Sequence, residues 1–88
     1  MQNPKLAEEI KKRLIEDDPD SWWANVLNTT PLKEALQDII DWYDGTADSG
    51  PMPDGCLVTL AHYAVTGIRP VDYPWYLKKY PWLGEIHD

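Results

Sequence analysis

Residues 31–45 read PLKEALQDIIDWYDG, and the spacing of their apolar side chains predicts the clearest helix in the chain. At 3.6 residues per turn these side chains span about 140° of the helix, the width of a single core-facing stripe. They are Leu32, Ala35, Leu36, Ile39, Ile40 and Tyr43. Thr30 can cap the first turn, Pro31 suits the first helical position, and Gly45 is a common terminator. We therefore expect a helix over residues 31–44.

Two shorter patterns before this segment also predict helices. Asn3 is expected to cap a helix over residues 4–16, and Asp18 a helix over residues 19–27, because each is a capping residue followed by proline. The first of these helices has one apolar stripe: Leu6, Ala7, Ile10 and Leu14. Each helix is therefore expected to bury one face against the rest of the chain.

A further helix is expected over residues 54–66, with Gly67 as its terminator. Its shared apolar face would contain Leu57, Leu60, Ala61, Ala64 and Val65. The competing interpretation is a strand over residues 56–65, since β-branched residues are frequent there. Apolar and polar residues do not alternate in this stretch, which favours the helix. Residues 45–54 contain several Gly and Pro and are expected to form the preceding loop.

The C-terminal segment repeats the tripeptide Tyr-Pro-Trp at residues 73–75 and 80–82. Pro74 can open a short helical turn over residues 74–79, and Pro81 would close or kink it. We expect this segment to lie across the helices as a strap. A chain of 88 residues has the length of one domain. The predicted fold is all-α: a small single-domain bundle of about four helices with an aromatic and proline-rich C-terminal strap.

The single cysteine, Cys56, excludes a disulfide framework within the chain and every zinc site that needs two or more cysteines. A reducing cytoplasm fits such a chain best. No apolar run reaches the length of a signal-peptide core, and none approaches the roughly 18 residues that span a membrane. The expected location is therefore the cytoplasm, with no membrane partner.

Catalytic and ligand-binding patterns are scarce. Cys56 and His62 lie six residues apart, which rotates them by about 240° on a helix and separates their side chains. An EF-hand calcium loop starting at Asp44 fails, because Ser49 stands where Gly is needed and Gly55 where Glu is needed. The sequence contains no phosphate-binding, dinucleotide-binding, nucleophile-elbow or HExxH motif. We therefore expect a protein without catalytic residues, metal sites or cofactors.

Charge is distributed unevenly along the chain. The net charge is −7, yet residues 17–60 alone carry nine Asp or Glu and one Lys, a net charge of −8. Within the expected third helix, Glu34, Asp38 and Asp41 recur at i, i+4 and i+7 and would form one exposed row with spacings of roughly 5–6 Å. This spacing resembles that of successive phosphates on a nucleic acid strand. An ordinary solvated helix face is the alternative interpretation.

The acidic row predicts a basic partner, since opposite charges steer two proteins together. The main cationic clusters, residues 11–13 and 78–79, are too small to contact many phosphates. Direct binding to nucleic acid or to an anionic membrane is therefore not expected.

The aromatic residues are five Trp and five Tyr, with no Phe. Such side chains suit partner surfaces, because the ring can pack while its polar edge stays hydrated; packing in the core is the alternative for each of them. The residues predicted to contact the partner combine the acidic row with neighbouring and C-terminal aromatic residues: Glu34, Asp38, Asp41, Trp42, Asp44, Trp75, Tyr76 and Trp82.

The sequence thus predicts a non-enzymatic, acidic protein-binding module that docks on a basic surface of a larger protein, for example a nucleic-acid-processing enzyme. In size and charge the chain is similar to the small acidic inhibitors carried by phages and mobile elements, such as anti-CRISPR proteins and nuclease inhibitors. This resemblance implies an inhibitor or modulator in the host cytoplasm and assigns no role to individual residues. The alternatives are an assembly protein that forms homodimers or larger homo-oligomers through its Trp and Tyr surfaces, and an enzyme with a carboxylate pair.

Overall fold

The computed structural model of the chain describes residues 2–46 and 52–86, and over these ranges it is helical without any strand. The elements are α1 (Pro4–Asp17), α2 (Trp22–Thr29), α3 (Leu32–Thr46), α4 (Gly55–Thr66), α5 (Tyr73–Lys79) and the 3₁₀ helix η1 (Pro81–Glu85). The all-α prediction is confirmed. The competing strand over residues 56–65 is wrong, because α4 covers that segment.

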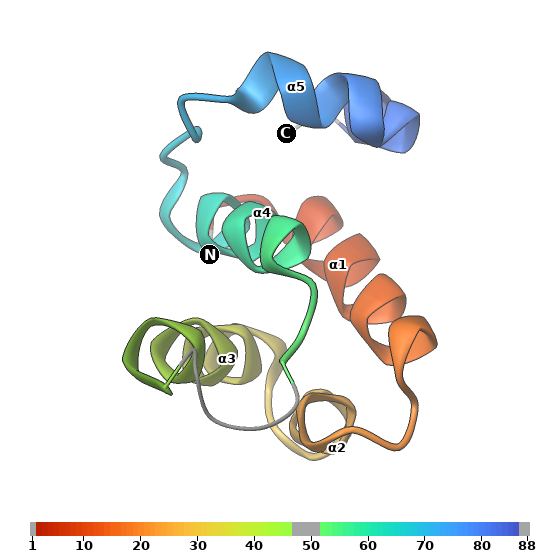
Figure 1. Ribbon diagram of the computed structural model, residues 1–88, viewed down its shortest axis with the longest axis vertical. Helices are drawn as coiled ribbons and strands as arrows, with labels where there is room; N and C mark the ends of the chain where they lie inside the picture. Colours follow the sequence, from red (N-terminus) through yellow and green to blue (C-terminus); the bar gives the residue numbers. More distant parts are fainter. Residues whose placement is uncertain (1, 47–51, 87–88) are drawn as a thin grey trace.

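Helix α4 lies between α1 and α3, at the centre of the fold (Figure 1). Helix α2 packs against α1 and α3 at one end, and α5 lies over the opposite side of α4. Because α4 has neighbours on several sides, it buries more than the single face predicted for it: Val58 and Tyr63 are also buried, whereas Val65 is only half-buried. The side chains that α4 buries are Leu57, Val58, Leu60, Ala61, Tyr63 and Ala64.

Helix α1 is anchored to the end of α4. Its predicted apolar stripe is confirmed, since these four residues are fully buried: Leu6, Ala7, Ile10 and Leu14. Asn3 caps the helix as predicted, and its side-chain oxygen accepts a hydrogen bond from Leu6 N at 3.1 Å. The backbone N–H groups of Gln2 and Asn3 donate to the Ala64 carbonyl of α4 at 3.1 and 3.0 Å. These bonds fix the start of α1 against α4.

Helix α2 begins three residues later than predicted. Its N-cap is Ser21, whose Oγ accepts from Ala24 N at 3.1 Å and donates to the Asp18 carbonyl at 2.7 Å. Asp18 instead ends α1, because its N–H still makes the last backbone bond of that helix. The proline that follows lies in the turn between the two helices. The predicted range 19–27 is therefore wrong at both ends, since α2 continues to Thr29.

Helix α3 follows the prediction at its apolar face but not at its ends. Its first backbone bond joins Ala35 N to the Pro31 carbonyl at 2.8 Å, so Pro31 precedes the helix rather than opening it. The helix continues through Gly45, the predicted terminator, because this glycine does not adopt a positive φ. Gly67, by contrast, ends α4 as predicted, with a φ of 79°. Half of the loop predicted over residues 45–54 lies outside the described residues.

The C-terminal segment covers the core as two short helices rather than as a strap with a single turn. Helix α5 ends ahead of Pro81, which opens the unpredicted 3₁₀ helix η1. Tyr76 of α5 and Leu83 of η1 are buried in the same core as α1–α4. Between them, the Tyr80 hydroxyl donates to the Asp54 carboxylate at the start of α4, at 3.5 Å. The segment is thereby joined to the helix at the centre of the fold.

Truncation of Leu60 tests whether α4 lies at the centre of the core. Its side chain is fully buried, and truncating such a leucine removes apolar contacts and leaves a cavity. We expect Leu60→Ala to lower the free energy of unfolding by about 2–5 kcal/mol in urea denaturation. Val71→Ala is the control, because Val71 is 97% exposed and its truncation should change the stability by about 0.5 kcal/mol or less. A loss for Leu60→Ala no larger than that of the control would contradict this packing.

Tyr80 reports on the junction between the C-terminal segment and α4. Burial, and then the charge of Asp54, raises the pKa of Tyr80 from 10.0 to about 12. The unfolded chain therefore loses this proton first, and the stabilising contribution is complete below about pH 10 and lost as the pH rises towards about 12. Tyr80→Phe should remove this part of the alkaline decline, measured by urea denaturation between about pH 10 and 12. Equal pH slopes for the two proteins would contradict the junction.

Candidate functional site

The exposed side of α3 carries four carboxylates, which we call the acidic face: Glu34, Asp38, Asp41 and Asp44. The rotation of α3 is set by its opposite side, where Leu36 and Ile39 are fully buried and residues half a turn away must face solvent. None of the four carboxylates forms an ion pair with another described residue, and the ion pair found in the described ranges joins Arg13 to Glu9 on α1 at 3.5 Å. The negative charge of the acidic face is therefore not neutralised by the described part of the chain.

Two tryptophan rings border the acidic face on the side of α2. The ring centroids of Trp42 and Trp22 lie 4.7 Å apart, and Trp22 meets Trp23 edge-on at 5.7 Å. Trp23 is buried, and its Nε1 donates to the Leu14 carbonyl at 3.1 Å. The half-buried Trp42 therefore packs against Trp22, which in turn packs against a tryptophan fixed by a hydrogen bond. The sequence pattern singles out Trp42 but not Trp22, whose contact depends on how α2 packs against α3.

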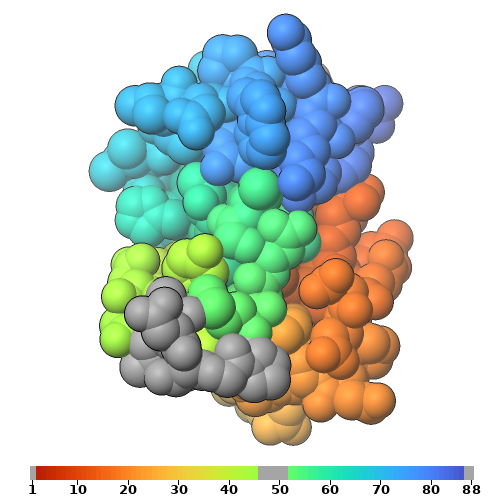
Figure 2. Space-filling model, viewed as in Figure 1, coloured from red at the N-terminus to blue at the C-terminus, as the bar shows by residue number. Residues whose placement is uncertain are grey.

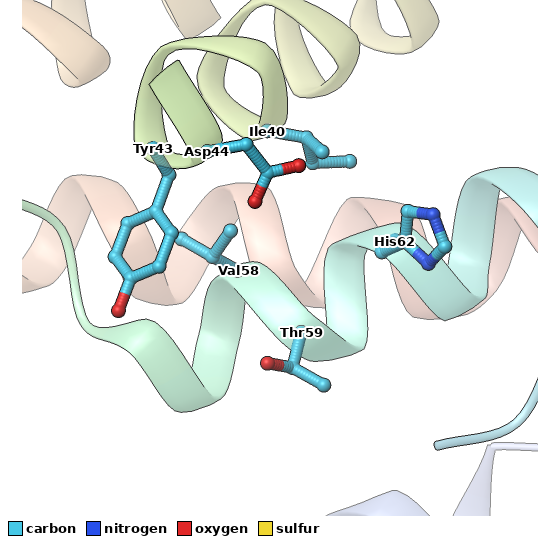
Figure 3. A pocket seen from close by; sticks show the side chains of 6 residues that line it. All are labelled: Ile40, Tyr43, Asp44, Val58, Thr59 and His62. Atoms are coloured by element: carbon cyan, nitrogen blue, oxygen red, sulfur yellow. The ribbon is translucent and has the colours of Figure 1, made fainter. Parts of the chain in front are cut away.

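A groove between α3 and α4 borders the acidic face on its other side, and we call it the α3–α4 groove (Figure 3). It has a volume of about 240 Å³ and is lined by Ile40, Tyr43, Asp44, Val58, Thr59 and His62. Figure 3 shows the Asp44 carboxylate and the Tyr43 ring extending from α3 toward α4. Asp44 belongs to both surfaces, so the acidic face and the groove are continuous. The sequence pattern does not identify Thr59 and His62 as site residues, because only the packing of α3 on α4 brings them to this groove.

The aromatic residues predicted as contacts in the C-terminal segment lie away from the acidic face. Figure 2 shows α5, in light blue, at one end of the molecule and α3, in yellow-green, nearer the other, with α4 between them. Trp75 is 52% exposed and meets Tyr76 edge-on at 5.0 Å. Tyr76 is only 7% exposed, so its ring belongs to the core and leaves little surface for a partner. Trp82 is half-buried, with the Arg13 guanidinium carbon 4.2 Å from its ring centroid.

The eight predicted contacts therefore do not form one surface. The structure brings five of them together on α3: Glu34, Asp38, Asp41, Trp42 and Asp44. The three C-terminal aromatic residues belong to α5 and η1, and α4 lies between α5 and α3 (Figure 2). A candidate binding surface consists of the acidic face with its two borders, the tryptophan pair and the α3–α4 groove.

Metal ligands are scattered in the part of the chain that the structure describes. Residues 2–46 and 52–86 contain no group of three or more His, Cys, Asp or Glu side chains placed to hold a metal ion. Within the same ranges, no helix combines the length and the apolar character needed to cross a membrane. Cys56 is a free thiol, and its Sγ lies 3.5 Å from the Lys79 amine.

Comparison of the chain with protein-family models, with curated proteins and with solved structures finds no match in any of the three. No residue role is therefore transferred from another protein. The roles given to the acidic face and the groove follow from their own chemistry.

Neighbouring residues of α5 should respond differently to truncation. We expect Tyr76→Ala to lower the free energy of unfolding by about 3 kcal/mol or more, because the ring is buried. Trp75→Ala should lower it by about 1 kcal/mol or less, because half of this ring is already in water. Urea denaturation of the two variants provides the comparison. A loss for Trp75→Ala as large as that for Tyr76→Ala would place Trp75 in the core instead of on the surface.

Proposed function

We propose that the protein is a non-enzymatic binding module whose acidic face docks on a basic surface of a larger protein and thereby inhibits or modulates it. The observation that carries this proposal is the acidic face itself, four exposed carboxylates on one helix without an ion pair to another described residue. Like charges at this spacing destabilise a helix by about 0.2–0.5 kcal/mol per pair. A cationic partner would offset this repulsion, because its positive charges attract the same carboxylates.

The acidic face suits a protein partner better than a nucleic acid. Several carboxylates on one side of a helix attract a cationic surface from a distance and raise the association rate. The adjacent rings of Trp42 and Trp22 add apolar area next to the charges, a combination typical of interface centres. Nucleic acid would be repelled by the net charge of −7.

The partner class is a protein with a basic surface, such as the groove of a nucleic-acid-processing enzyme. Successive carboxylates on α3 are spaced by about 5–6 Å, which resembles the spacing of phosphates on a strand. An acidic face of this kind can compete for a surface that otherwise binds phosphates. The size and charge of the chain, similar to those of inhibitors carried by phages and mobile elements, support such a role in the host cytoplasm.

A second candidate function is self-association, and exposed apolar side chains around the start of α5 favour it. Ile68, Val71 and Trp75 are 66%, 97% and 52% exposed. A second copy of the chain could cover them without using the acidic face. Salt separates the two candidates, because association steered by charge slows at high ionic strength while an apolar homodimer responds little.

The double variant Asp38→Lys/Asp41→Lys tests the acidic face. The partner is first captured from host-cell lysate on the tagged protein at low salt, released by stepwise increases in salt, identified by mass spectrometry and purified. The variant should bind this partner more weakly by about 1 kcal/mol or more, a factor of about five or more in Kd, because two attractive charges become repulsive. Calorimetry or surface-based binding measures the difference.

The matched control is Glu8→Lys/Glu16→Lys, which changes the net charge equally on exposed positions of α1. The control should keep most of the affinity, and both double variants should retain the wild-type melting temperature within a few degrees. Unchanged affinity of Asp38→Lys/Asp41→Lys would refute docking through the acidic face. Recovery of the tagged chain alone, with a light-scattering mass of two or more copies, would favour self-association.

A further inference from the structure

We propose that the α3–α4 groove receives an arginine side chain of the basic partner and selects arginine over lysine. This inference rests on the proposed function, because it names the chemical group that the binding surface recognises. Charge complementarity places a cationic side chain at this groove, because Asp44 is an exposed carboxylate that lines the groove and also belongs to the acidic face.

The size and the floor of the groove fit a single long side chain. Its volume of about 240 Å³ lies below the roughly 300–1,000 Å³ of pockets for small-molecule ligands and cofactors. Ile40 and Val58 form an apolar floor, each being only 4% exposed. The aliphatic stem of a cationic side chain can lie along such a floor while its charged end remains at the rim.

The Tyr43 ring forms a wall of the groove and reaches the backbone of Gly55. A Cβ atom at Gly55 would lie 2.6 Å from the Tyr43 hydroxyl oxygen, so the phenol packs directly against the backbone at the start of α4, and a larger residue at position 55 would displace it. Tyr43 is half-buried, and part of its ring lines the groove. A planar guanidinium stacks on such a ring, whereas a compact lysine ammonium makes a point contact.

The groove is also lined by two groups whose oxygens can accept hydrogen bonds, the Asp44 carboxylate and the Thr59 hydroxyl. The Asp44 carboxylate, directed from α3 toward α4 in Figure 3, can accept two parallel N–H bonds from one guanidinium. The Thr59 hydroxyl already donates to the Gly55 carbonyl at 3.0 Å, so its oxygen can only accept a further bond. An arginine supplies five donors in one plane and a lysine three on one atom. The groove therefore matches arginine in both shape and donor count.

Octa-arginine and octa-lysine peptides of equal charge provide the probes. Each is titrated into the ¹⁵N-labelled full chain at about 50 mM salt, with calorimetry for Kd. We expect octa-arginine to bind about fivefold more tightly or better, and to shift the amide resonances of Tyr43, Asp44 and Thr59. Octa-lysine should perturb the acidic face with smaller shifts in the groove.

Two variants test the groove directly. Asp44→Asn should reduce the preference for arginine to less than about twofold, because the bidentate acceptor is lost. Asp20→Asn removes the same charge on the turn between α1 and α2 and should keep the preference. Thr59→Phe fills the groove without changing the charge and should also abolish the preference. Asp44 is exposed, so its variant should fold even if Thr59→Phe does not.

The outcomes distinguish this inference from the proposed function. If both peptides bind the wild type equally and Asp38→Lys/Asp41→Lys weakens both, the acidic face binds cations and the groove proposal is wrong. If neither peptide binds the wild type more tightly than it binds that double variant, the acidic face fails as well. Equal loss of the arginine preference in Asp44→Asn and Asp20→Asn would also overturn the groove, because net charge alone would then explain it.

Discussion

Burial of α4 on several sides organises the whole molecule. Ala61 and Ala64 are fully buried, and their small side chains let the neighbouring helices approach α4 closely; Leu60 is fully buried in the same core. Helix α3 must turn its apolar side toward this core, and the same rotation directs its carboxylates to the solvent. The acidic face is thus a geometric consequence of the core, while its density of negative charge is a property of the sequence alone.

Several charged side chains of α3 lower the stability of that helix. Glu34 in the first turn interacts favourably with the helix dipole, but Asp44 lies near the opposite end, where a cation would be favoured, and the last turn contains no basic residue. Asp38 and Asp41 add repulsion along the same side. Burial of Leu36 and Ile39 offsets these costs. Charge that opposes local stability and faces solvent supports the binding role that we propose for the acidic face.

The sequence predicted those features that depend on local periodicity and failed where neighbouring elements compete. The stripe of α1, the cap at Asn3 and the terminator at Gly67 follow from spacing within one helix. The start of α2 could not be predicted from spacing, because the backbone N–H of Asp18 still bonds within α1 and Asp18 ends that helix. Ser21 caps α2 instead. The groove depends on α3 packing against α4, and no periodicity within one segment reveals it.

We propose that the acidic face and its borders form the binding surface. Hydrogen–deuterium exchange of the protein, free and bound to the purified partner, tests it most directly. We expect slower exchange in the complex for α3 and for the first turns of α4, with α5 unchanged. Slower exchange confined to residues 67–79, with α3 unchanged, would refute binding through the acidic face and assign it to the apolar surface around Val71 and Trp75.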